Sequence, residues 1–162
     1  MVNNNIVIEG AKLIWRNFSG KEGDYNPKGN RNFCVLLDEK LGKQLAEDGW
    51  NIKWTTPKEE GDESQPYIQV AVRFDNFPPK IVAITSGGKL TLNEDGVNKL
   101  DWAEITNADV IINPYNWERN GKSGVKAYLK SLYVTLYEDE FERKYSNVPD
   151  SALNTIKGDM EE

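Results

Sequence analysis

ADVIINPYNWERNGKSGVKAYLKSLYVTLY, residues 108–137, is the stretch that decides the fold, because it predicts a long β-hairpin. Asn120-Gly121 lies at its centre, and these two residue types best tolerate the positive φ angles of a type I′ turn. Both flanks are rich in β-branched and aromatic residues, which favour strands. Pro114 cannot donate to a β-ladder, so an outer edge or a bulge is expected there.

The side-chain alternation changes phase on the second arm of this hairpin. The residues that share a face are Val125, Ala127 and Leu129 before the change, and Leu132, Val134 and Leu136 after it. A phase slip at Lys130-Ser131 predicts a β-bulge, which bends a strand and is common where a sheet curls into a barrel.

The remaining chain reads as short strands and one helix. Extended segments are predicted over residues 5–19, with a bend at Gly10, and over residues 31–37, 50–55, 67–74, 80–85 and 89–92. Asp38 is a suitable N-cap, Leu41 and Leu45 form an apolar i, i+4 pair, and Gly49 fits a C-terminal stop, which together predict a helix. Residues 93–102 are expected to form turns or one helical turn.

Seven or eight short strands around one helix predict a mainly all-β fold. We expect an OB-fold-like, partly open β-barrel with long hairpins and one short α-helix, since this barrel carries an inserted helix and long loops. A jelly-roll or a β-sandwich is the alternative. We assign residues 1–137 to the domain and residues 138–162 to an acidic C-terminal tail.

Charge is distributed unevenly along the 162 residues. The net charge is −6, but residues 138–162 hold eight of the 26 acidic and three of the 20 basic residues, which leaves 18 acidic and 17 basic residues in the body. A nearly neutral body permits a local basic groove, and it equally permits a mixed, solubilising surface. The absence of a long apolar run or a secretory signal predicts a soluble, cytoplasmic protein.

Residues able to carry out catalysis are scarce. The chain has no histidine, so the usual general base and metal ligand are absent. Cys34, the single cysteine, lies in an apolar run and is expected to be a buried thiol. Residues 86–89 lack the full phosphate-loop spacing, and the acidic pairs fall in loop sequence. We therefore expect no enzyme, no cofactor and no metal.

Aromatic residues next to cations are the most informative feature. Five Trp and seven Tyr occur, several of them beside Lys or Arg. Single-stranded nucleic acid is bound by this combination, because bases stack on rings while cations contact phosphates. Trp50 and Trp102 are assigned to core or helix packing, and Trp15 and Trp54 fit either role. The candidate DNA-binding residues are Trp15, Arg16, Lys28, Arg31, Lys53, Trp54, Arg73, Tyr115, Trp117, Arg119, Lys122, Lys126 and Tyr128.

Three segments, KLIWRNFSG (12–20), RNFCVLLD (31–38) and residues 112–137, resemble bacteriophage single-stranded-DNA-binding proteins of OB-fold type. The resemblance implies a non-enzymatic protein that coats strands in replication or recombination, often as a dimer, in the host cytoplasm. It also implies direct strand contacts by Trp117, Arg119, Lys122, Lys126 and Tyr128, supported by Trp15, Arg16 and Arg31.

The C-terminus departs from the pattern of that family. Its members commonly end in an acidic run with a terminal aromatic residue that recruits replication partners, whereas this chain ends KGDMEE and has its nearest aromatic residues at Phe141 and Tyr145. A tail that competes electrostatically with nucleic acid fits the sequence as well as one that recruits replication or recombination proteins. The alternative function is a phage-encoded protein-interaction module, either a host-factor inhibitor or a virion component, and a sugar-binding sandwich ranks third.

Overall fold

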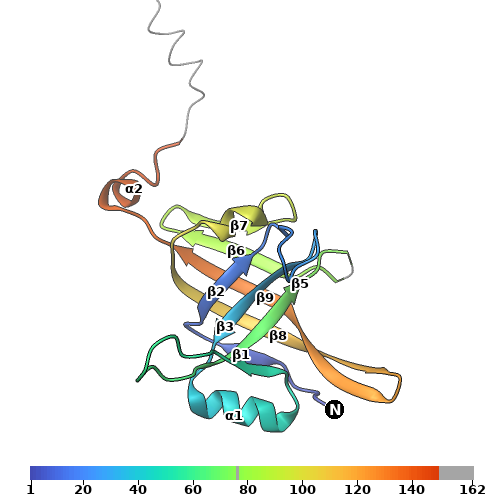
Figure 1. Ribbon diagram of the computed structural model, residues 1–162. Coiled ribbons are helices and arrows are strands. Elements are labelled where there is room, and N and C mark those ends of the chain that lie inside the picture. The colour runs from blue at the N-terminus through green and yellow to red at the C-terminus, as the bar shows by residue number, and fades with distance from the viewer. Residues whose placement is uncertain (76, 150–162) are drawn as a thin grey trace, which may run out of the picture.

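The computed structural model describes residues 1–75 and 77–149 (Figure 1). The strands are β1 (Ile6–Ile8), β2 (Lys12–Asn17), β3 (Arg31–Leu36), β4 (Ile52–Trp54), β5 (Pro66–Val72), β6 (Lys80–Thr85), β7 (Gly88–Leu92), β8 (Ile105–Arg119) and β9 (Lys122–Leu136). The helices are α1 (Glu39–Asp48), the 3₁₀ helix η1 (Val97–Asp101) and α2 (Glu140–Lys144).

All nine strands belong to one sheet that does not close. Its main path runs β1-β8-β9-β5-β3-β2, while β4 pairs with β5, and β6 pairs with β7 and β9. The strands at the two ends of the path, β1 and β2, are consecutive in the chain and are joined through Gly10, which has a φ of 64°. The predicted mainly-β, partly open architecture is confirmed, with two separate strands in place of one bent strand over residues 5–19.

The hairpin β8–β9 has the predicted turn and the predicted bulge. Asn120 and Gly121 have φ angles of 53° and 78°, as a type I′ turn requires. Ile111 pairs with Ser131 and Ile112 with Leu129, so Lys130 is the extra residue that shifts the register. Its projecting arm extends beyond the body of the sheet (Figure 1).

Pro114 lies at an edge but not at a bulge. It pairs with Ala127 within the continuous β8–β9 ladder, so the ladder is not interrupted there. Strand β1 covers β8 only at Val110–Ile112, which leaves the outer side of β8 at Pro114 free of a neighbouring strand. The missing N–H of proline is tolerated at such an edge.

The core lies on the inner face of the sheet. Its largest fully buried side chains include Phe18, Phe33, Ile68, Ile112 and Leu132. Phe18 and Phe33 stack with their ring centroids 5.1 Å apart. The Cys34 thiol is also buried, as expected.

Helix α1 begins and ends as predicted and covers one end of the core. The Asp38 side chain accepts a hydrogen bond from the Leu41 amide at 2.7 Å, and Gly49 closes the helix with a φ of 110°. Leu45 and Gly42 are the buried residues of the helix. Gly42 is needed for contact with the sheet, since a Cβ at this position would lie 2.5 Å from the Pro66 ring.

One other expectation is wrong. Trp50 is buried, but Trp102 is 68% exposed and contributes nothing to the core. Helix α2 was not predicted, and its residues are all exposed. The remainder of the expected tail, residues 150–162, lies outside the described residues.

We expect Gly42→Ala to destabilise the protein. Alanine in place of glycine normally favours a helix interior by about 1 kcal/mol, but overpacking against a fixed ring costs about 1–3 kcal/mol. The net loss in the free energy of unfolding, measured with urea, is expected to be about 1 kcal/mol. Gly23→Ala is the matched control, because nothing lies within 4 Å of its added Cβ. A Gly42→Ala protein as stable as the Gly23→Ala protein would contradict this packing argument.

Candidate nucleic-acid interface

The outer face of the sheet carries the side chains of the candidate interface. Strand pairing sets Asn32 opposite Ala71, Ala71 beside Tyr128, and Tyr128 opposite Asn113. Directly paired residues point to the same side of a sheet, so these side chains share one face. Tyr115 and Lys126 follow on the same side. Strand alternation thus builds an outer face across β3, β5, β9 and β8.

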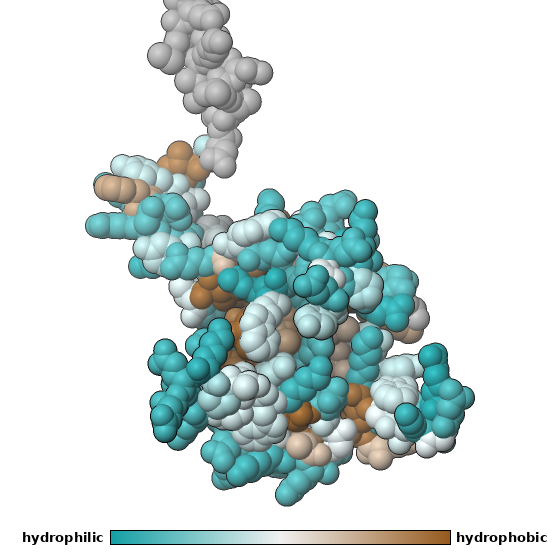
Figure 2. All heavy atoms as spheres, viewed as in Figure 1, coloured by the Kyte–Doolittle hydropathy of each residue, from teal (hydrophilic) through white to brown (hydrophobic). Residues whose placement is uncertain are grey.

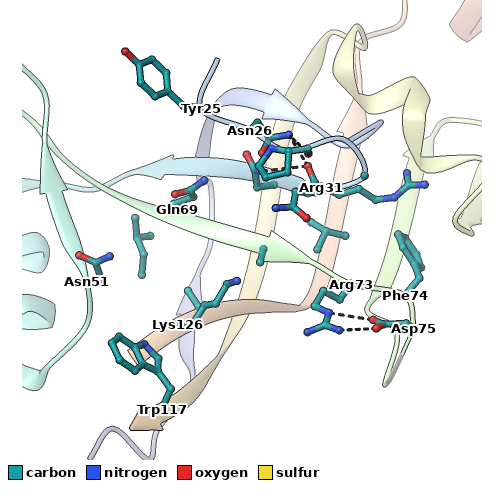
Figure 3. A pocket seen from close by; sticks show the side chains of 18 of the residues that line it. Tyr25, Asn26, Arg31, Asn51, Gln69, Arg73, Phe74, Asp75, Trp117 and Lys126 are labelled. Atoms are coloured by element: carbon teal, nitrogen blue, oxygen red, sulfur yellow. Dashed lines mark hydrogen bonds and ion pairs between the residues drawn. The ribbon is translucent and has the colours of Figure 1, made fainter. Parts of the chain in front are cut away.

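A groove of about 620 Å³ lies over part of this face (Figure 3). One wall is the hairpin arm with Trp117 and Lys126, and the opposite wall includes Tyr25 and Asn26 from the loop before β3. Of the predicted residues, four line the groove: Arg31, Arg73, Trp117 and Lys126. On the side of the molecule seen in Figure 2, hydrophobic side chains form only small separate areas.

Aromatic rings and cations meet on the hairpin side of the groove. Tyr115 and Tyr128 form an edge-to-face pair with centroids 5.8 Å apart. The Lys126 ammonium lies 5.4 Å from the Tyr128 ring centroid, and the Arg73 guanidinium lies 6.0 Å from it. Both distances fall within the range of cation–π attraction. This cluster joins the β8–β9 hairpin to Arg73, which directly follows β5 and lies far from the hairpin in sequence.

Arg73 is held in place by Asp75. Its Nε donates to one carboxylate oxygen at 3.1 Å and its Nη2 contacts the other at 2.5 Å. Hydrogen bonds to Asp75 and then to Tyr128 raise the pKa of Arg73 above its ordinary value. The guanidinium is therefore a fixed positive charge at the end of the groove.

Trp117 lies across a glycine of the opposing strand. It pairs with Gly124, and a Cβ on Gly124 would be 2.7 Å from Cζ2 of the indole. The absence of a side chain at position 124 lets the ring lie close to the backbone of β9. The ring is 41% exposed, so much of its surface is available to a ligand.

A second aromatic pair occupies the other end of the outer face. Trp15 and Tyr67 meet edge to face with centroids 5.0 Å apart, and Lys53 pairs with Tyr67 across β4 and β5. Trp15 has a φ of 48° where the β2–β3 register shifts, and this conformation turns its side chain away from the regular alternation of the strand. Burial raises the pKa of the nearby Cys34 thiol to about 11, with Lys53 opposing the shift, so the thiol stays protonated at neutral pH.

Two of the predicted arginines make hydrogen bonds or ion pairs with other residues of the protein. Arg16 donates to the carbonyls of Leu100 and Ala103 at 2.8 and 2.7 Å. Arg31 donates to the Phe18 carbonyl at 2.6 Å and forms an ion pair with Glu94 at 3.6 Å. These two guanidinium groups are thus partly occupied by the protein itself.

The remaining candidates are exposed but do not line the groove. Arg119 and Lys122 pair at the hairpin tip, and Lys28 lies in the loop before β3. Trp54 pairs with Pro66, so alternation along β4 places its side chain on the opposite face from Lys53.

Sequence reasoning missed several polar residues of the groove. Gln69 and Asn51 line it, as do Asn26 and Asn32. Alternation over residues 67–74 places Gln69, Ala71 and Arg73 on one face, which is the available signal. That signal did not tell which face of the strand would be open to solvent.

Comparison with known proteins gives the family. Residues 1–162 match the family described as "Putative phage ssDNA-binding domain". The chain belongs to this family. No protein with a curated description matches the sequence.

Solved structures show the same fold. The single-stranded DNA-binding protein from bacteriophage Enc34 in complex with ssDNA has a TM-score of 0.56 at 12% identity, with 85% of this chain and 89% of that chain covered. The C-terminal truncation of the Enc34 protein gives 0.54 at 11% identity, covering 83% and 87%. At this identity the likeness concerns the fold alone.

The described residues, 1–75 and 77–149, contain no group of three or more His, Cys, Asp or Glu that could hold a metal ion. No helix among them is long and apolar enough to cross a bilayer.

Gly124→Ala is expected to displace the Trp117 indole. The added methyl cannot stay 2.7 Å from the ring, and the ring is exposed enough to move away without unfolding the protein. The measurement is the NMR resonance of the indole N–H of Trp117, assigned with Trp117→Phe. Ser123→Ala changes the neighbouring residue on the opposite side of β9 and should leave that resonance in place. An unshifted resonance in Gly124→Ala would show that the ring does not lie over β9.

Proposed function

We propose that this protein binds single-stranded DNA through the outer face of its sheet, without enzymatic activity, and coats strands during phage replication or recombination. The observation that carries the proposal is the joining of exposed rings and cations in one groove, in a chain that belongs to a phage ssDNA-binding family. The solved ssDNA complex of the Enc34 protein, which shares the fold, supports it.

In this proposal, bases stack on Trp117 and on the Tyr115–Tyr128 pair. Stacking on an aromatic side chain contributes about 1–3 kcal/mol per base and is tolerant of sequence. The edge-to-face arrangement fixes the two tyrosine rings before DNA arrives, which reduces the entropy lost on binding. The Trp15–Tyr67 pair at the other end of the face would continue the same path.

Phosphates are contacted by the cations beside these rings. Among the described residues Lys126 makes no ion pair, so its ammonium is available to a phosphate. Arg73 is oriented by Asp75, and Lys53 lies opposite Tyr67. A net charge of −6 does not oppose this mode, because the fields of exposed charges beyond about 10 Å are largely screened at 0.1 M salt.

The finer parts of the proposal concern organisation and partners. We assign DNA binding to residues 1–137 in the bacterial host cytoplasm, and we propose that the protein forms a homodimer there. The tail from residue 138 is proposed to compete with DNA and to contact replication or recombination proteins. Its described part supports this, because Phe141 and Tyr145 are exposed next to acidic residues of α2.

Two substitutions should separate stacking from phosphate contact. Trp117→Ala is expected to lower the affinity for an oligothymidine about 10-fold without changing its salt dependence, because about 1–3 kcal/mol of stacking is lost. Lys126→Gln should lower the affinity and reduce the slope of log K against log salt by about 0.7, the value for one phosphate contact on a single strand. Fluorescence anisotropy of a labelled oligonucleotide across a salt series measures both.

Lys89→Gln is the matched control for the lost charge. Lys89 is exposed on β7, which contributes no residue to the groove, so its slope should equal that of the unmodified protein. If Lys126→Gln and Lys89→Gln reduce the slope equally, binding depends on overall charge and the assigned groove is wrong.

Neutralising the tail tests its competition with DNA. The double substitution Glu140→Gln and Glu142→Gln should tighten oligothymidine binding about two-fold at low salt, with no gain at high salt where the charges are screened. The control is Glu59→Gln with Glu60→Gln in the exposed loop before β5. Equal gains in both proteins would leave the tail without a specific role in competition.

A further inference from the structure

Trp102 is an exposed tryptophan on a firmly held backbone. Its side chain is 68% exposed, although it follows directly on the 3₁₀ helix η1. The Asp101 carboxylate accepts hydrogen bonds from the backbone N–H groups of Phe18 and Ser19, at 2.5 and 3.2 Å. These anchors come from the turn that follows β2, and Arg31 of β3 adds a hydrogen bond to Asn98 within η1, while the Trp102 ring remains outside.

Arg16 completes this anchoring. Its guanidinium donates to the carbonyls on either side of the ring, those of Leu100 and Ala103. One partly buried arginine therefore joins two backbone positions on either side of Trp102. These hydrogen bonds fix the position of the Trp102 ring at the surface without burying it. Packing of the core does not require a tryptophan held in this way.

Lys21 lies over the Trp102 ring. Its ammonium is 4.4 Å from the ring centroid, within cation–π distance. The Lys21 backbone is also held, since its N–H donates to the Asn17 side chain at 2.8 Å and its carbonyl accepts from Asn17 and Asn26. The ring and the cation are thus both set on constrained backbone.

The loop that carries Lys21 also forms a wall of the groove. Asn26, which bonds to the Lys21 carbonyl, lines the groove together with Tyr25. The Asn26 side chain bonds to Asn32 on the outer face of β3 as well. The Trp102–Lys21 pair is therefore connected to the groove through one hydrogen-bonded loop, yet none of its atoms lines the groove.

We propose that Trp102 and Lys21 form a second contact for single-stranded nucleic acid, which a strand reaches only when it is longer than the groove holds. The inference rests on the proposed function and adds a separate site to it. A base would stack on the exposed indole, and the ammonium beside it would contact the adjoining phosphate. Arg16 is then a positioning residue for this site.

A length series tests the proposal on the full chain. Oligothymidines of about 4 to 16 nucleotides cover the range that one OB-type domain occupies. The oligonucleotide is kept in excess so that each strand binds one protein molecule. The unmodified protein should then gain affinity at the length at which the strand can reach the second contact. Trp102→Ala and Lys21→Gln should bind the shortest oligonucleotides normally and lose that gain, about 10-fold for Trp102→Ala at the longest length. Trp102→Tyr, which keeps a ring, should recover most of it.

The outcomes separate this site from the proposed groove. Trp117→Ala should weaken binding at every length, whereas Trp102→Ala should act only on long strands. Equal losses at all lengths, or no loss at any length, in a Trp102→Ala protein with an unchanged melting temperature would overturn the second site and leave the groove intact. If the unmodified protein binds no oligothymidine, the proposed function itself fails.

Discussion

The one-residue slip at Lys130 allows a single hairpin to serve both the core and the outer face. With strict alternation, Lys126, Tyr128, Leu132 and Val134 would all point to the same side of β9. The extra residue reverses the register, so Leu132 and Val134 are fully buried while Lys126 and Tyr128 point outward. On the side of the bulge away from the turn, the hairpin strands lie in the middle of the sheet. On the side toward the turn, they form a wall of the groove.

The groove is made of groups that the protein has already ordered. Arg73 is fixed by Asp75, and the Trp117 ring lies close to the backbone of Gly124. Beside the groove, Tyr115 packs edge to face against Tyr128. Ordering side chains before a ligand binds reduces the conformational entropy lost on association. The smaller entropy loss matters for a protein that binds without sequence preference. Each stacking or phosphate contact contributes only a small binding free energy, and several nucleotides are needed to sum them.

The fold was predictable where the decisive contacts are local in sequence. Asn120-Gly121 determines its own turn, the slip at Lys130 is visible in the alternation of β9, and Asp38 and Gly49 mark the ends of α1. The site was less predictable because a side chain's partners come from distant segments. Arg16 and Arg73 look alike in sequence, but the partners of Arg16 are carbonyls more than 80 residues away, at Leu100 and Ala103. Local sequence likewise does not show that Val97 and Leu100 fill the apolar side of η1, so that Trp102, which follows this helix, stays exposed.

The pairing of β1 with β8 determines when the sheet can be completed during synthesis. Ile6 pairs with Ile112, so β1 has no partner strand until the hairpin has been made. Strands β2, β3 and β5 can pair with one another earlier, but β5 joins them to the rest of the sheet only through its parallel pairing with β9. Such non-local pairing slows folding and leaves strand edges exposed in the meantime. The hairpin, whose contacts are local, can form as soon as it is made, and the earlier strands then assemble on it. The β8–β9 hairpin is therefore the element that joins β1 to the strands β2, β3 and β5.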